Sequence, residues 1–596
     1  MTTADNLFTL REKMAAHNVD ALILPTSDFH DTEYVCEYFG ARKHFSGFTG
    51  SAGVLVVLKD KAGLWTDGRY FIQAGREIEG SGIDLMKMGQ PGVPTIEAYL
   101  QENLADGATL AFDGRCVSME AFEGYRDSLN DKNVTIVTDL DLAGEAWPDR
   151  PALPASRTFH YPEKYNGESV ASKLARVREA MKEAGAKHHI TTKVDEIAWL
   201  FNLRANDIPN FPVALAYAII NEEDGVLYID ENRLDEESAK LLAESGIKTA
   251  PYNQIYDDID ALEGPVMMEK DYVNSRIGRA IKDAIWMTNP IQLMKACKNA
   301  VEVENAREAH KRDAVAVIRF WKWLDEQLEA DNEVTEISAA EKLHEFRGQM
   351  PDFLEDSFET ISAYHANASM PHYHPDRENP VRIEKKGMHL VDSGGQYLQG
   401  TTDITRTFVT GEMTEEERIA FTRVLQGHID LAKAVFMEGA RGMNLDILCR
   451  QYLWQDGRDY NHGTGHGVGA LSNVHEGPNG FRWKVVPERK DSCVLEPGMI
   501  TSDEPGLYVE GKYGIRHENM IVVVPAFETE FGNFLRHDVL TLVPFDVRGL
   551  DLNLMHQDQI DWLNAYHQQV YDEIAPRLNK DEAAWLYERT RPVHQD

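Results

Sequence analysis

The sequence predicts mixed α/β and α+β architecture, with two related α/β domains followed by a larger domain that carries the chemistry. The chain has 596 residues, which exceeds the length of one ordinary domain. The order helix, short strand and hairpin occurs twice, about 167 positions apart. From Gly387 onward the pattern changes to strands separated by glycine-rich turns. These three observations predict a duplicated N-terminal half and a distinct C-terminal half.

Each of the two related segments begins with a helical pattern and continues in strands. In the first segment we expect a helix at Leu7–His17, a strand at Ala21–Leu24, and a hairpin made of Gly53–Leu58 and Gly63–Trp65. In the second segment we expect a helix at Leu174–Ala184, a strand at His188–Thr191, and a hairpin made of Ala216–Ile220 and Val226–Ile229. The proline-rich stretch Pro148–Pro162 is a plausible linker.

The third region begins with a long helical pattern at Val301–Leu328. Met388–Asp392 and Thr402–Val409 are then predicted as antiparallel strands, with Gly394–Gly400 as the turn region between them. The stretch after Pro544 is predicted to be helical. The resulting domain prediction is 1–155, 156–300 and 301–596.

The overall charge excludes several classes of partner. With 98 acidic and 61 basic residues, the formal net charge is −37, which argues against binding nucleic acid or an anionic membrane. The five cysteines are scattered and form no C-x-x-C pair, as expected in a reducing compartment. The N-terminal segment lacks the apolar stretch of a signal peptide, and no run approaches the roughly 20 apolar residues of a membrane helix. We therefore expect a cytoplasmic protein.

Four acids and one histidine of the third region occur in strand or glycine-turn contexts. Alone, any one of these acids is better explained as a turn cap or a solvated strand edge. Two adjacent carboxylates resist joint ionisation, however, and a divalent cation removes that conflict. Four carboxylates and an imidazole suffice for two metal ions if some carboxylates bridge, and such a nitrogen and oxygen set suits manganese, cobalt or zinc. The five residues are Asp392, Asp403, His466, Glu504 and Glu518.

The order of these ligands, Asp, Asp, His, Glu and Glu, resembles that of the pita-bread metallopeptidases. Three motifs look more specifically like the three-domain, large form of aminopeptidase P: Trp65–Phe71, Asp195–Arg204 and His462–Gly469. The resemblance covers nearly the whole chain. It implies two creatinase/prolidase-like N-terminal domains before a pita-bread catalytic domain with a helical C-terminal extension.

The resemblance also implies a function and a role for each ligand. The implied enzyme is a metallo-exopeptidase that releases the N-terminal residue from peptides with proline at the second position. It would use two divalent ions, with manganese favoured over zinc or cobalt. Asp403 and Glu518 would bridge both ions, Asp392 would bind one ion, and His466 and Glu504 would bind the other. A hydroxide held between the ions would attack the scissile carbonyl, and Glu504 would pass its proton to the proline nitrogen.

Five further side chains are predicted to act in catalysis or substrate binding, and His466 is expected to bind substrate in addition to metal. His372 and His475 match substrate histidines of the family, the latter donating to the transition-state oxyanion. His462 matches a further active-site histidine. Arg69 matches a substrate-contacting arginine, although a structural salt bridge explains it equally well. Arg516 would share a strand face with Glu518, if Gly514–Val524 is one strand, and would orient that carboxylate.

Two features bear on substrate preference. The stretch Ile361–Ala368 is less glycine-rich than we associate with this position, and it adds Tyr364 and His365 near the expected substrate cleft. Val474 is a candidate wall for the proline ring, with a core valine as the alternative.

Several alternatives stay open at this point. Prolidase shares the fold and the five ligands, although the full second N-terminal domain argues against it. A non-enzymatic peptide- or histone-binding module and the metal-free creatinase are disfavoured because all five ligands are kept. A homodimer built through the third region is expected. Trp562 and Trp585 could supply its surface, although packing within the chain explains them as well.

Overall fold

The protein is described by a computed structural model that covers residues 2–486 and 491–595. The chain divides into two compact units. The first unit consists of Met1–Pro162 and Glu168–Gln292, and the second of Glu163–Gly167 and Leu293–Asp596. The first unit contains both related segments, whereas the second contains the five predicted metal ligands. The predicted three-domain division at residues 155 and 300 stays a prediction.

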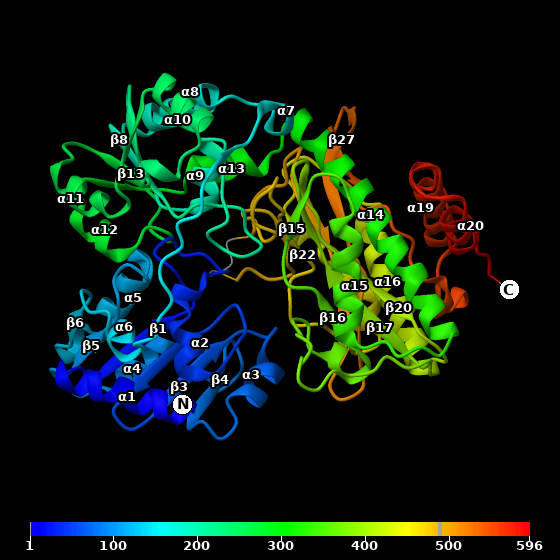
Figure 1. The fold of residues 1–596 in the computed structure, drawn as a ribbon, viewed down its shortest axis with the longest axis horizontal. Coiled ribbons are helices and arrows are strands. Elements are labelled where there is room, and N and C mark those ends of the chain that lie inside the picture. Colours follow the sequence, from blue (N-terminus) through cyan, green and yellow to red (C-terminus); the bar gives the residue numbers. More distant parts are fainter. Residues whose placement is uncertain (1, 487–490, 596) are drawn as a thin grey trace. The chain divides into compact units, whose positions relative to one another are not determined.

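The first related segment is built on a six-stranded sheet of order β4-β3-β2-β1-β5-β6 (Figure 1). Its strands are β1 (Ala21–Pro25), β2 (Val54–Leu58), β3 (Ala62–Thr66), β4 (Ile83–Lys87), β5 (Thr109–Ala111) and β6 (Thr135–Val137). β2 is antiparallel to both neighbours, and the remaining pairs are parallel. The central strands are continuous apolar runs because both faces of the sheet are covered.

The second related segment repeats this topology strand for strand. Its sheet has the order β12-β11-β10-β8-β13-β14. Its strands are β8 (His188–Thr191), β10 (Tyr217–Asn221), β11 (Gly225–Tyr228), β12 (Ile247–Ala250), β13 (Val266–Met268) and β14 (Ala284–Trp286). β10 is antiparallel to both neighbours and the other pairs are parallel, as at the equivalent positions of the first sheet. The duplication predicted from the sequence is therefore confirmed at the level of topology. A separate short ribbon pairs β7 (Phe159–His160) with β9 (Leu203–Arg204).

The helices of the first unit begin where local capping groups are available. The first helix starts four residues before the predicted position because Thr2 and Asp5 form a capping box. The second repeat's long helix is capped by Ser169 and ends at Gly185, which has a φ of 72°. The helices are α1 (Thr3–Ala16), α2 (Ala41–Ser46), α3 (Phe71–Glu77), α4 (Ile96–Asn103), α5 (Met119–Leu129), α6 (Leu142–Ala146), α8 (Val170–Ala184), α9 (Val194–Leu200), α10 (Glu236–Glu244), α11 (Ile255–Asp258) and α12 (Ser275–Ala280).

The second unit is built from helices packed on several small sheets. Its long helix α14 begins with a capping box formed by Asn299 and Glu302. The helices are α7 (Glu163–Asn166), α14 (Ala300–Glu329), α15 (Glu336–Gly348), α16 (Glu415–Ala432), α17 (Gly442–Leu445), α18 (Ile447–Gln455), α19 (Gln557–Ile574) and α20 (Lys580–Arg589), and α13 (Pro290–Ala296) precedes them at the junction with the first unit.

The sheets of the second unit supply the scaffold for the predicted ligands. One has the order β16-β17-β20, one β21-β28-β27-β24 and one β15-β18-β19, and two further strand pairs are β22-β23 and β25-β26. Their bounds are β15 (Phe353–Asp356), β16 (Ile361–Tyr364), β17 (Met388–Ser393), β18 (Gly395–Tyr397), β19 (Gly400–Thr401), β20 (Ile404–Val409), β21 (Val435–Met437), β22 (Gly465–His466), β23 (Gly480–Phe481), β24 (Ile500–Asp503), β25 (Gly506–Val509), β26 (Tyr513–Arg516), β27 (Asn519–Thr529) and β28 (Gly532–Val539).

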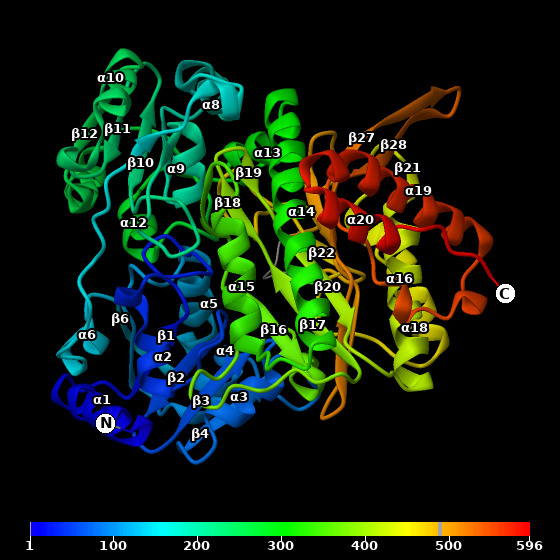
Figure 2. The same cartoon turned by 45° about the vertical axis from the view of Figure 1, so that its right-hand side comes forward.

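The core of this unit joins the helices to the β16-β17-β20 sheet. Figure 2 shows α14 and α15 side by side over these strands. The Trp321 ring of α14 lies 5.0 Å from the ring of Phe408 in β20 and 5.2 Å from the ring of Trp585 in α20. Trp562 stacks on Tyr566 at 5.2 Å. Both C-terminal tryptophans therefore pack within the chain, and both remain partly exposed.

Two predictions about the strands were wrong. Gly394–Gly400 is not a simple turn, because it contains β18 and most of the β18–β19 hairpin, which pairs with β15 in a sheet of its own. Gly514–Val524 is not one strand either. It breaks at His517 and Glu518 into β26, which pairs with β25, and β27, which pairs with β24 and β28. In the described residues, no helix is long and apolar enough to cross a bilayer.

Candidate metal centre

Asp392 and Asp403 are brought together by an antiparallel strand pair. Asp392 lies in β17, and Asp403 directly precedes β20. The register places Asp392 opposite Thr405 and Ser393 opposite Ile404, so both carboxylates lie at the same end of the pair. Only 8% of Asp392 and 4% of Asp403 is exposed. The strands thus hold two acids close together inside the protein.

Glu504 and Glu518 are held at one end of a second strand pair. Glu504 follows β24 and Glu518 precedes β27, and the two strands pair with Asp503 opposite Asn519. The backbone N–H of Glu518 donates to the carbonyl of Thr405 in β20 at 3.1 Å. The Thr405 hydroxyl donates in turn to Oε2 of Glu518 at 2.7 Å. The break between β26 and β27 therefore docks Glu518 onto the strand that follows Asp403.

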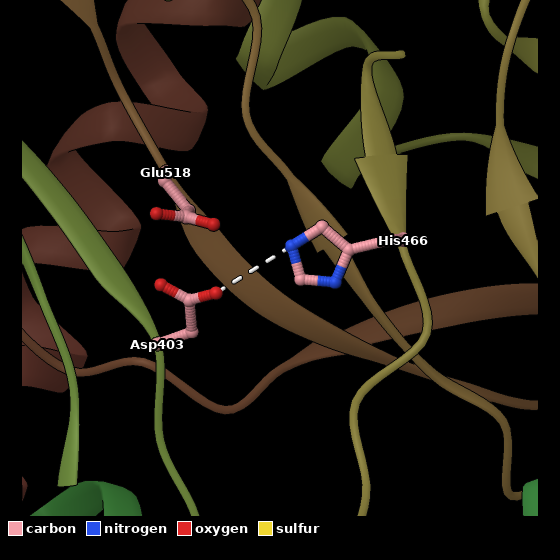
Figure 3. Close-up of side chains that lie close together, drawn as sticks. All are labelled: Asp403, His466 and Glu518. Atoms are coloured by element: carbon pink, nitrogen blue, oxygen red, sulfur yellow. Dashed lines mark ion pairs between the residues drawn. The ribbon is translucent and has the colours of Figure 1, made fainter. Parts of the chain in front are cut away.

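His466 completes the cluster from β22, as Figure 3 shows together with Asp403 and Glu518. Its Nε2 lies 3.5 Å from Oδ2 of Asp403 and 3.3 Å from Oε1 of Glu504. Ligand atoms of Asp403, His466 and Glu518 all lie within 4.8 Å of one another. Gly465 allows this close approach, since a Cβ there would lie 1.7 Å from the carbonyl oxygen of Ser502.

The carboxylates oppose one another electrostatically. Burial raises the pKa of Asp403 well above its ordinary value, and Asp392 and Glu504 raise it further. Burial, followed by Asp403 and Asp392, raises the pKa of Glu518 in the same way. Burial also raises the pKa of Glu504 to about 8, despite the nearby cation of Arg516. The protein alone does not supply enough positive charge for four ionised acids.

Divalent cations fit this arrangement. Oδ1 of Asp392 and Oδ1 of Asp403 are buried and accept no hydrogen bond from any residue that the structure describes. Unsatisfied buried oxygens of this kind are unfavourable unless another group binds them. Carboxylate oxygens with one imidazole nitrogen are suitable ligands for manganese, zinc or cobalt. The chemistry of the donors therefore matches the metal ions that the sequence predicts.

Arg516 contacts a different acid from the one predicted. Because the predicted strand breaks after Arg516, its guanidinium does not share a strand face with Glu518. Its Nη2 donates to Oδ2 of Asp392 at 2.5 Å, and its Nε donates to the hydroxyl of Thr405 at 3.1 Å. Arg516 therefore reaches Glu518 only through Thr405 and pairs directly with Asp392.

His462 lies at the end of a hydrogen-bond chain that starts at Arg516. Arg516 Nη1 donates to the Tyr508 hydroxyl at 2.6 Å, and that hydroxyl lies 2.8 Å from His462 Nε2. Nδ1 of His462 lies 2.7 Å from the carbonyl oxygen of Gly463. Burial, together with Arg516, lowers the pKa of His462 well below its ordinary value. A neutral ring that donates from Nδ1 and accepts at Nε2 satisfies all three contacts.

The other two predicted histidines belong to loops beside the cluster. The His475 ring lies edge-on to the His466 ring, with centroids 4.3 Å apart. His372 is half-buried in the segment after β16, where the carbonyl of Pro371 accepts from Arg516 at 3.2 Å. The neighbouring Tyr373 donates to the buried carboxylate of Glu336 at 2.8 Å. The structure thus gathers His466 and His475 closely, and it ties the His372 segment to Arg516.

Arg69 belongs to the first unit and is engaged by two acids. It donates from Nε and Nη2 to Asp67, and from Nη1 to Glu33 at 2.7 Å. Of the other substrate-side candidates, Val474 is only 3% exposed and thus resembles a core valine. Tyr364 is buried and donates to the carbonyl of Lys386, whereas His365 is exposed.

Sequence reasoning missed three polar residues of the centre: Thr405, Tyr508 and Ser502. Ser502 links His466 to Glu504, because its hydroxyl accepts from the backbone N–H of His466 at 2.9 Å and donates to Oε1 of Glu504 at 3.1 Å. Thr405 and Ser502 each lie two residues from a predicted ligand on a strand, where side chains share a face. That spacing could have identified both, whereas Tyr508 depends on tertiary contacts and carries no local signal.

Four ranges of the chain match models of known protein families. Residues 304–525 match metallopeptidase family M24, and residues 533–593 match its C-terminal region. Residues 7–141 and 149–302 each match the creatinase/prolidase N-terminal domain. The two related segments of the first unit therefore match the same domain family.

Individual relatives match over the full length of the chain. A probable Xaa-Pro aminopeptidase P of Laccaria bicolor is 38% identical, with 100% of this chain and 94% of the relative covered. Aminopeptidase P2 of Arabidopsis thaliana is 38% identical, with 96% and 86% covered. The crystal structure of an X-prolyl aminopeptidase from Caenorhabditis elegans, described as a cytosolic enzyme with a di-nuclear active site, superposes with a TM-score of 0.95. It is 33% identical and covers 100% of both chains.

Proposed function

Because the chain belongs to metallopeptidase family M24, among its Xaa-Pro aminopeptidases, we propose that it releases the N-terminal residue from peptides whose second residue is proline. The protein is a metal-dependent aminopeptidase. The observation that carries this function is the grouping of Asp403, His466 and Glu518 within a chain that matches Xaa-Pro aminopeptidases from end to end.

The cofactor is two divalent ions per chain, as in the di-nuclear relative. Asp403 and Glu518 would contact both ions, Asp392 would hold one, and His466 and Glu504 would hold the other. We favour manganese over zinc and cobalt because oxygen ligands predominate. When bound, the ions would polarise the scissile carbonyl and lower the pKa of water enough to supply hydroxide near neutral pH.

Glu504 is the proposed proton carrier. In the protein alone, burial raises the pKa of Glu504 to about 8. A carboxylate at this position can take up the proton of the attacking water and hand it to the proline nitrogen when the bond breaks. Ser502, which donates to Oε1 of Glu504 at 3.1 Å, would keep the carboxylate oriented during both transfers.

Three further side chains are proposed to bind substrate, and a fourth, His462, to act through a neighbour. His475 would donate to the oxyanion of the tetrahedral intermediate, and His372 would contact the peptide on the other side of the reacting carbonyl. His462 would act through Tyr508, because both of its ring nitrogens are already engaged. Arg69, which Asp67 and Glu33 hold in place, would bind the peptide beyond proline through its guanidinium.

Proline at the second position gives such a site its selectivity. Proline has no backbone N–H and fixes its own φ, so the peptide bond before it is a poor substrate for general aminopeptidases. A site that never requires an amide donor at that position loses nothing when proline occupies it. The same site gains from the low conformational entropy of the proline residue.

We further propose a homodimer, built through the second unit. Four exposed apolar side chains of one sheet support this assembly: Val435 and Met437 of β21 are 51% and 50% exposed, and Phe527 and Phe531 of the β27–β28 hairpin are 55% and 74% exposed. Large exposed apolar patches are typical of protein contacts. A monomeric mass at micromolar concentration, measured by light scattering, would refute the dimer.

A cytoplasmic location is proposed on two grounds. The C. elegans relative is described as a cytosolic enzyme. In addition, the five cysteines of this chain are free thiols, as expected in a reducing compartment.

Three peptides that share a first residue test the proposed function. Purified protein with manganese is given an Xaa-Pro dipeptide, an Xaa-Pro-Yaa tripeptide and an Xaa-Ala-Yaa tripeptide. We expect efficient release from Xaa-Pro-Yaa, poor release from Xaa-Pro and little release from Xaa-Ala-Yaa. Efficient release from Xaa-Ala-Yaa would remove the proline requirement, and a strong preference for Xaa-Pro would identify a prolidase instead.

A further inference from the structure

A second cluster of buried charge lies beside the metal centre and takes no part in the chemistry described above. Its members are the carboxylate of Glu476 and the ammonium groups of Lys295 and Lys298. Lys295 Nζ lies 2.9 Å from Glu476 Oε2, and Lys298 Nζ lies 2.5 Å from Glu476 Oε1. At most 3% of any of these side chains is exposed.

Burying such a cluster costs desolvation free energy that its ion pairs do not necessarily recover. Two ammonium groups share one carboxylate, and all three lose their hydration. Ion pairs of this kind are frequently no more stabilising than apolar side chains of similar volume, although removal of one partner is strongly destabilising. The cluster therefore needs an explanation other than net stability, and its position supplies one.

The carboxylate of the cluster is attached directly to the loop that carries His475. The backbone N–H of Glu476 donates to the carbonyl of Gly467, the residue after the predicted ligand His466, at 2.8 Å. A Cβ at Gly467 would lie 2.0 Å from the Glu476 carbonyl oxygen, and a Cβ at Gly469 would lie 2.8 Å from Glu476 Oε2. Glu476 thus fixes the His475 loop against the segment that follows His466.

The lysines are anchored at the opposite side of the cluster. The backbone N–H of Lys298 donates to the carbonyl of Gly498 at 3.2 Å, and the N–H of Gly498 donates to the carbonyl of Val523 in β27 at 2.9 Å. Gly498 has a φ of 89°, and a Cβ there would lie 2.3 Å from the Lys298 carbonyl oxygen. The lysine segment is therefore fixed to the strand that begins directly after Glu518.

The far end of the His475 loop is held separately. Gln396 Nε2 donates to the carbonyl of Ser472 at 2.8 Å, and the backbone N–H of Ser472 donates to the Thr401 hydroxyl at 3.1 Å. Both partners belong to the β18–β19 hairpin. With this end fixed by neutral hydrogen bonds, the ionic cluster controls the end of the loop nearest His475.

We propose that Lys295, Glu476 and Lys298 form an ionic clamp that positions His475 relative to the metal centre, and thereby sets the rate of the chemical step. The inference rests on the proposed function, in which His475 donates to the oxyanion. The three clamp residues are positioning residues: none of them belongs to the proposed ligands or substrate contacts, and they act through the backbone of the His475 loop.

Lys298→Met breaks the clamp and Lys298→Arg preserves its charge. For peptide release from Xaa-Pro-Yaa, we expect Lys298→Met to lower kcat by about 10- to 100-fold, as small misplacements of catalytic groups do. KM and the two metal ions per chain should stay unchanged, and Lys298→Arg should restore most of kcat. The measurements are steady-state kinetics on the metal-loaded enzyme and metal content by mass spectrometry.

A matched control removes a buried cation elsewhere. Arg233 of the first unit pairs with the buried Asp207 at 2.5 Å. Arg233→Met should lower the melting temperature as Lys298→Met does, but leave kcat at the wild-type value. Equal kcat losses in both variants would show that general destabilisation explains the effect, and would overturn the clamp.

Combination with His475→Ala tests the route through which the clamp acts. If the clamp works by placing His475, the double variant His475→Ala/Lys298→Met should have the kcat of His475→Ala alone, because coupled residues are not additive. A double variant whose kcat falls by the product of the two single losses would overturn the inference. A Lys298→Met enzyme with the wild-type kcat would overturn it too, as would one whose bound metal falls in proportion to its kcat.

Misfolding of the variant and failure of the proposed function must each be distinguished from failure of the clamp. If Lys298→Met does not accumulate as folded protein, Glu476→Gln, which keeps the side-chain shape, decides by the same criteria. If wild-type enzyme does not release the first residue from Xaa-Pro-Yaa, the proposed function fails, whereas an active wild type with unaffected variants overturns the clamp alone.

Discussion

Asp313 and Asp403 are both buried aspartates of the second unit, yet their surroundings move their pKa values in opposite directions. Burial by itself would raise the pKa of Asp313, but Arg347 and Tyr397 together outweigh burial and hold that pKa below the ordinary value. The guanidinium reaches both carboxylate oxygens, at 2.8 and 3.0 Å, and Tyr397 adds a donor at 2.8 Å. Among the described residues no guanidinium is hydrogen-bonded to Asp403, and burial and its acidic neighbours raise its pKa despite the nearby Arg516.

The contrast distinguishes an acid that is balanced by a cation of the protein from one whose charge requires a bound metal ion. The Asp313 pair is balanced in charge, and both oxygens of its carboxylate accept hydrogen bonds within the protein, although Nη1 of Arg347 has no partner among the described residues. The cluster around Asp403 sets four carboxylates against Arg516, and leaves Oδ1 of Asp392 and of Asp403 without a partner among the described residues. Both sites are buried and acidic, so burial alone does not identify a metal site. The charge that the protein leaves uncompensated does.

The largest effect is expected where the uncompensated charge is greatest. Asp403→Asn removes one charge from a proposed bridging ligand, and should reduce bound metal below two ions per chain and abolish measurable activity. Chelation of the wild type should have the same consequence, reversed by manganese or cobalt. Metal content by mass spectrometry and peptide release measure both.

The comparison would break if Asp403→Asn kept two ions and its activity. It would break equally if the wild type stayed fully active after verified removal of all metal. Asp313→Asn is the matched control, since it removes one buried aspartate charge in the same unit and should retain its metal.

The second effect concerns stability instead of activity. Asp313→Asn leaves Arg347 buried and unpaired, and should cost about 3–5 kcal/mol of unfolding free energy at neutral pH. A carboxyl with a lowered pKa stabilises the fold above its unfolded pKa and loses that contribution on acidification. The deficit of Asp313→Asn should therefore shrink as the pH falls below about 3.9, the ordinary aspartate value.

Urea unfolding of the metal-free protein at several pH values measures this deficit. Arg347→Met should show the same size of loss, since it breaks the same pair. A deficit that stays constant down to pH 2 would mean that the ion pair does not stabilise the fold, and that Asp313 is held by its neutral hydrogen bonds.

The sequence pointed to the five proposed ligands, three of which the structure groups within reach of one ion, but not to the balance of charge around them. Asp392, Asp403, His466, Glu504 and Glu518 stand in short motifs with strand or turn patterns, and their order resembles a known family. The long α14 helix and the duplicated sheets follow from periodicity and repeat spacing in the same way. Features that depend on short-range pattern are therefore recoverable from one sequence.

Features that depend on tertiary contact were not recoverable. A single strand from Gly514 to Val524 was the condition for placing Arg516 beside Glu518, and nothing local shows that Glu518 must turn toward Thr405 and end the pairing of β26. The same break redirects Arg516 from Glu518 to Asp392. Lys295 and Glu476 are separated by more than 180 positions and occur in no common motif, so their pairing is visible only in three dimensions.

The third effect separates the chemical role of Glu504 from its role as a ligand. Glu504→Gln keeps the shape and one coordinating oxygen but removes the proton acceptor, so kcat should fall by about 100-fold or more. Metal content should remain closer to the wild type than in Asp403→Asn. Single-turnover kinetics on Xaa-Pro-Yaa measure the step directly, and near-normal turnover would assign the proton transfer to another group.

The smallest effect is expected at Arg69, whose guanidinium is balanced by two carboxylates much as Arg347 is balanced by one. Asp67 and Glu33 hold it in place, and its guanidinium is the proposed donor to a peptide carbonyl beyond proline. Arg69→Lys retains the charge but loses the fork, which corresponds to about one charged hydrogen bond. We expect KM for Xaa-Pro-Yaa to rise by about tenfold with kcat unchanged, and KM for the Xaa-Pro dipeptide, which lacks Yaa, to stay the same. Equal KM shifts for both peptides would place the contact before Yaa. A lower melting temperature with no kinetic change would show that Arg69 serves only in a structural ion pair of the first unit, as Arg347 does in the second unit.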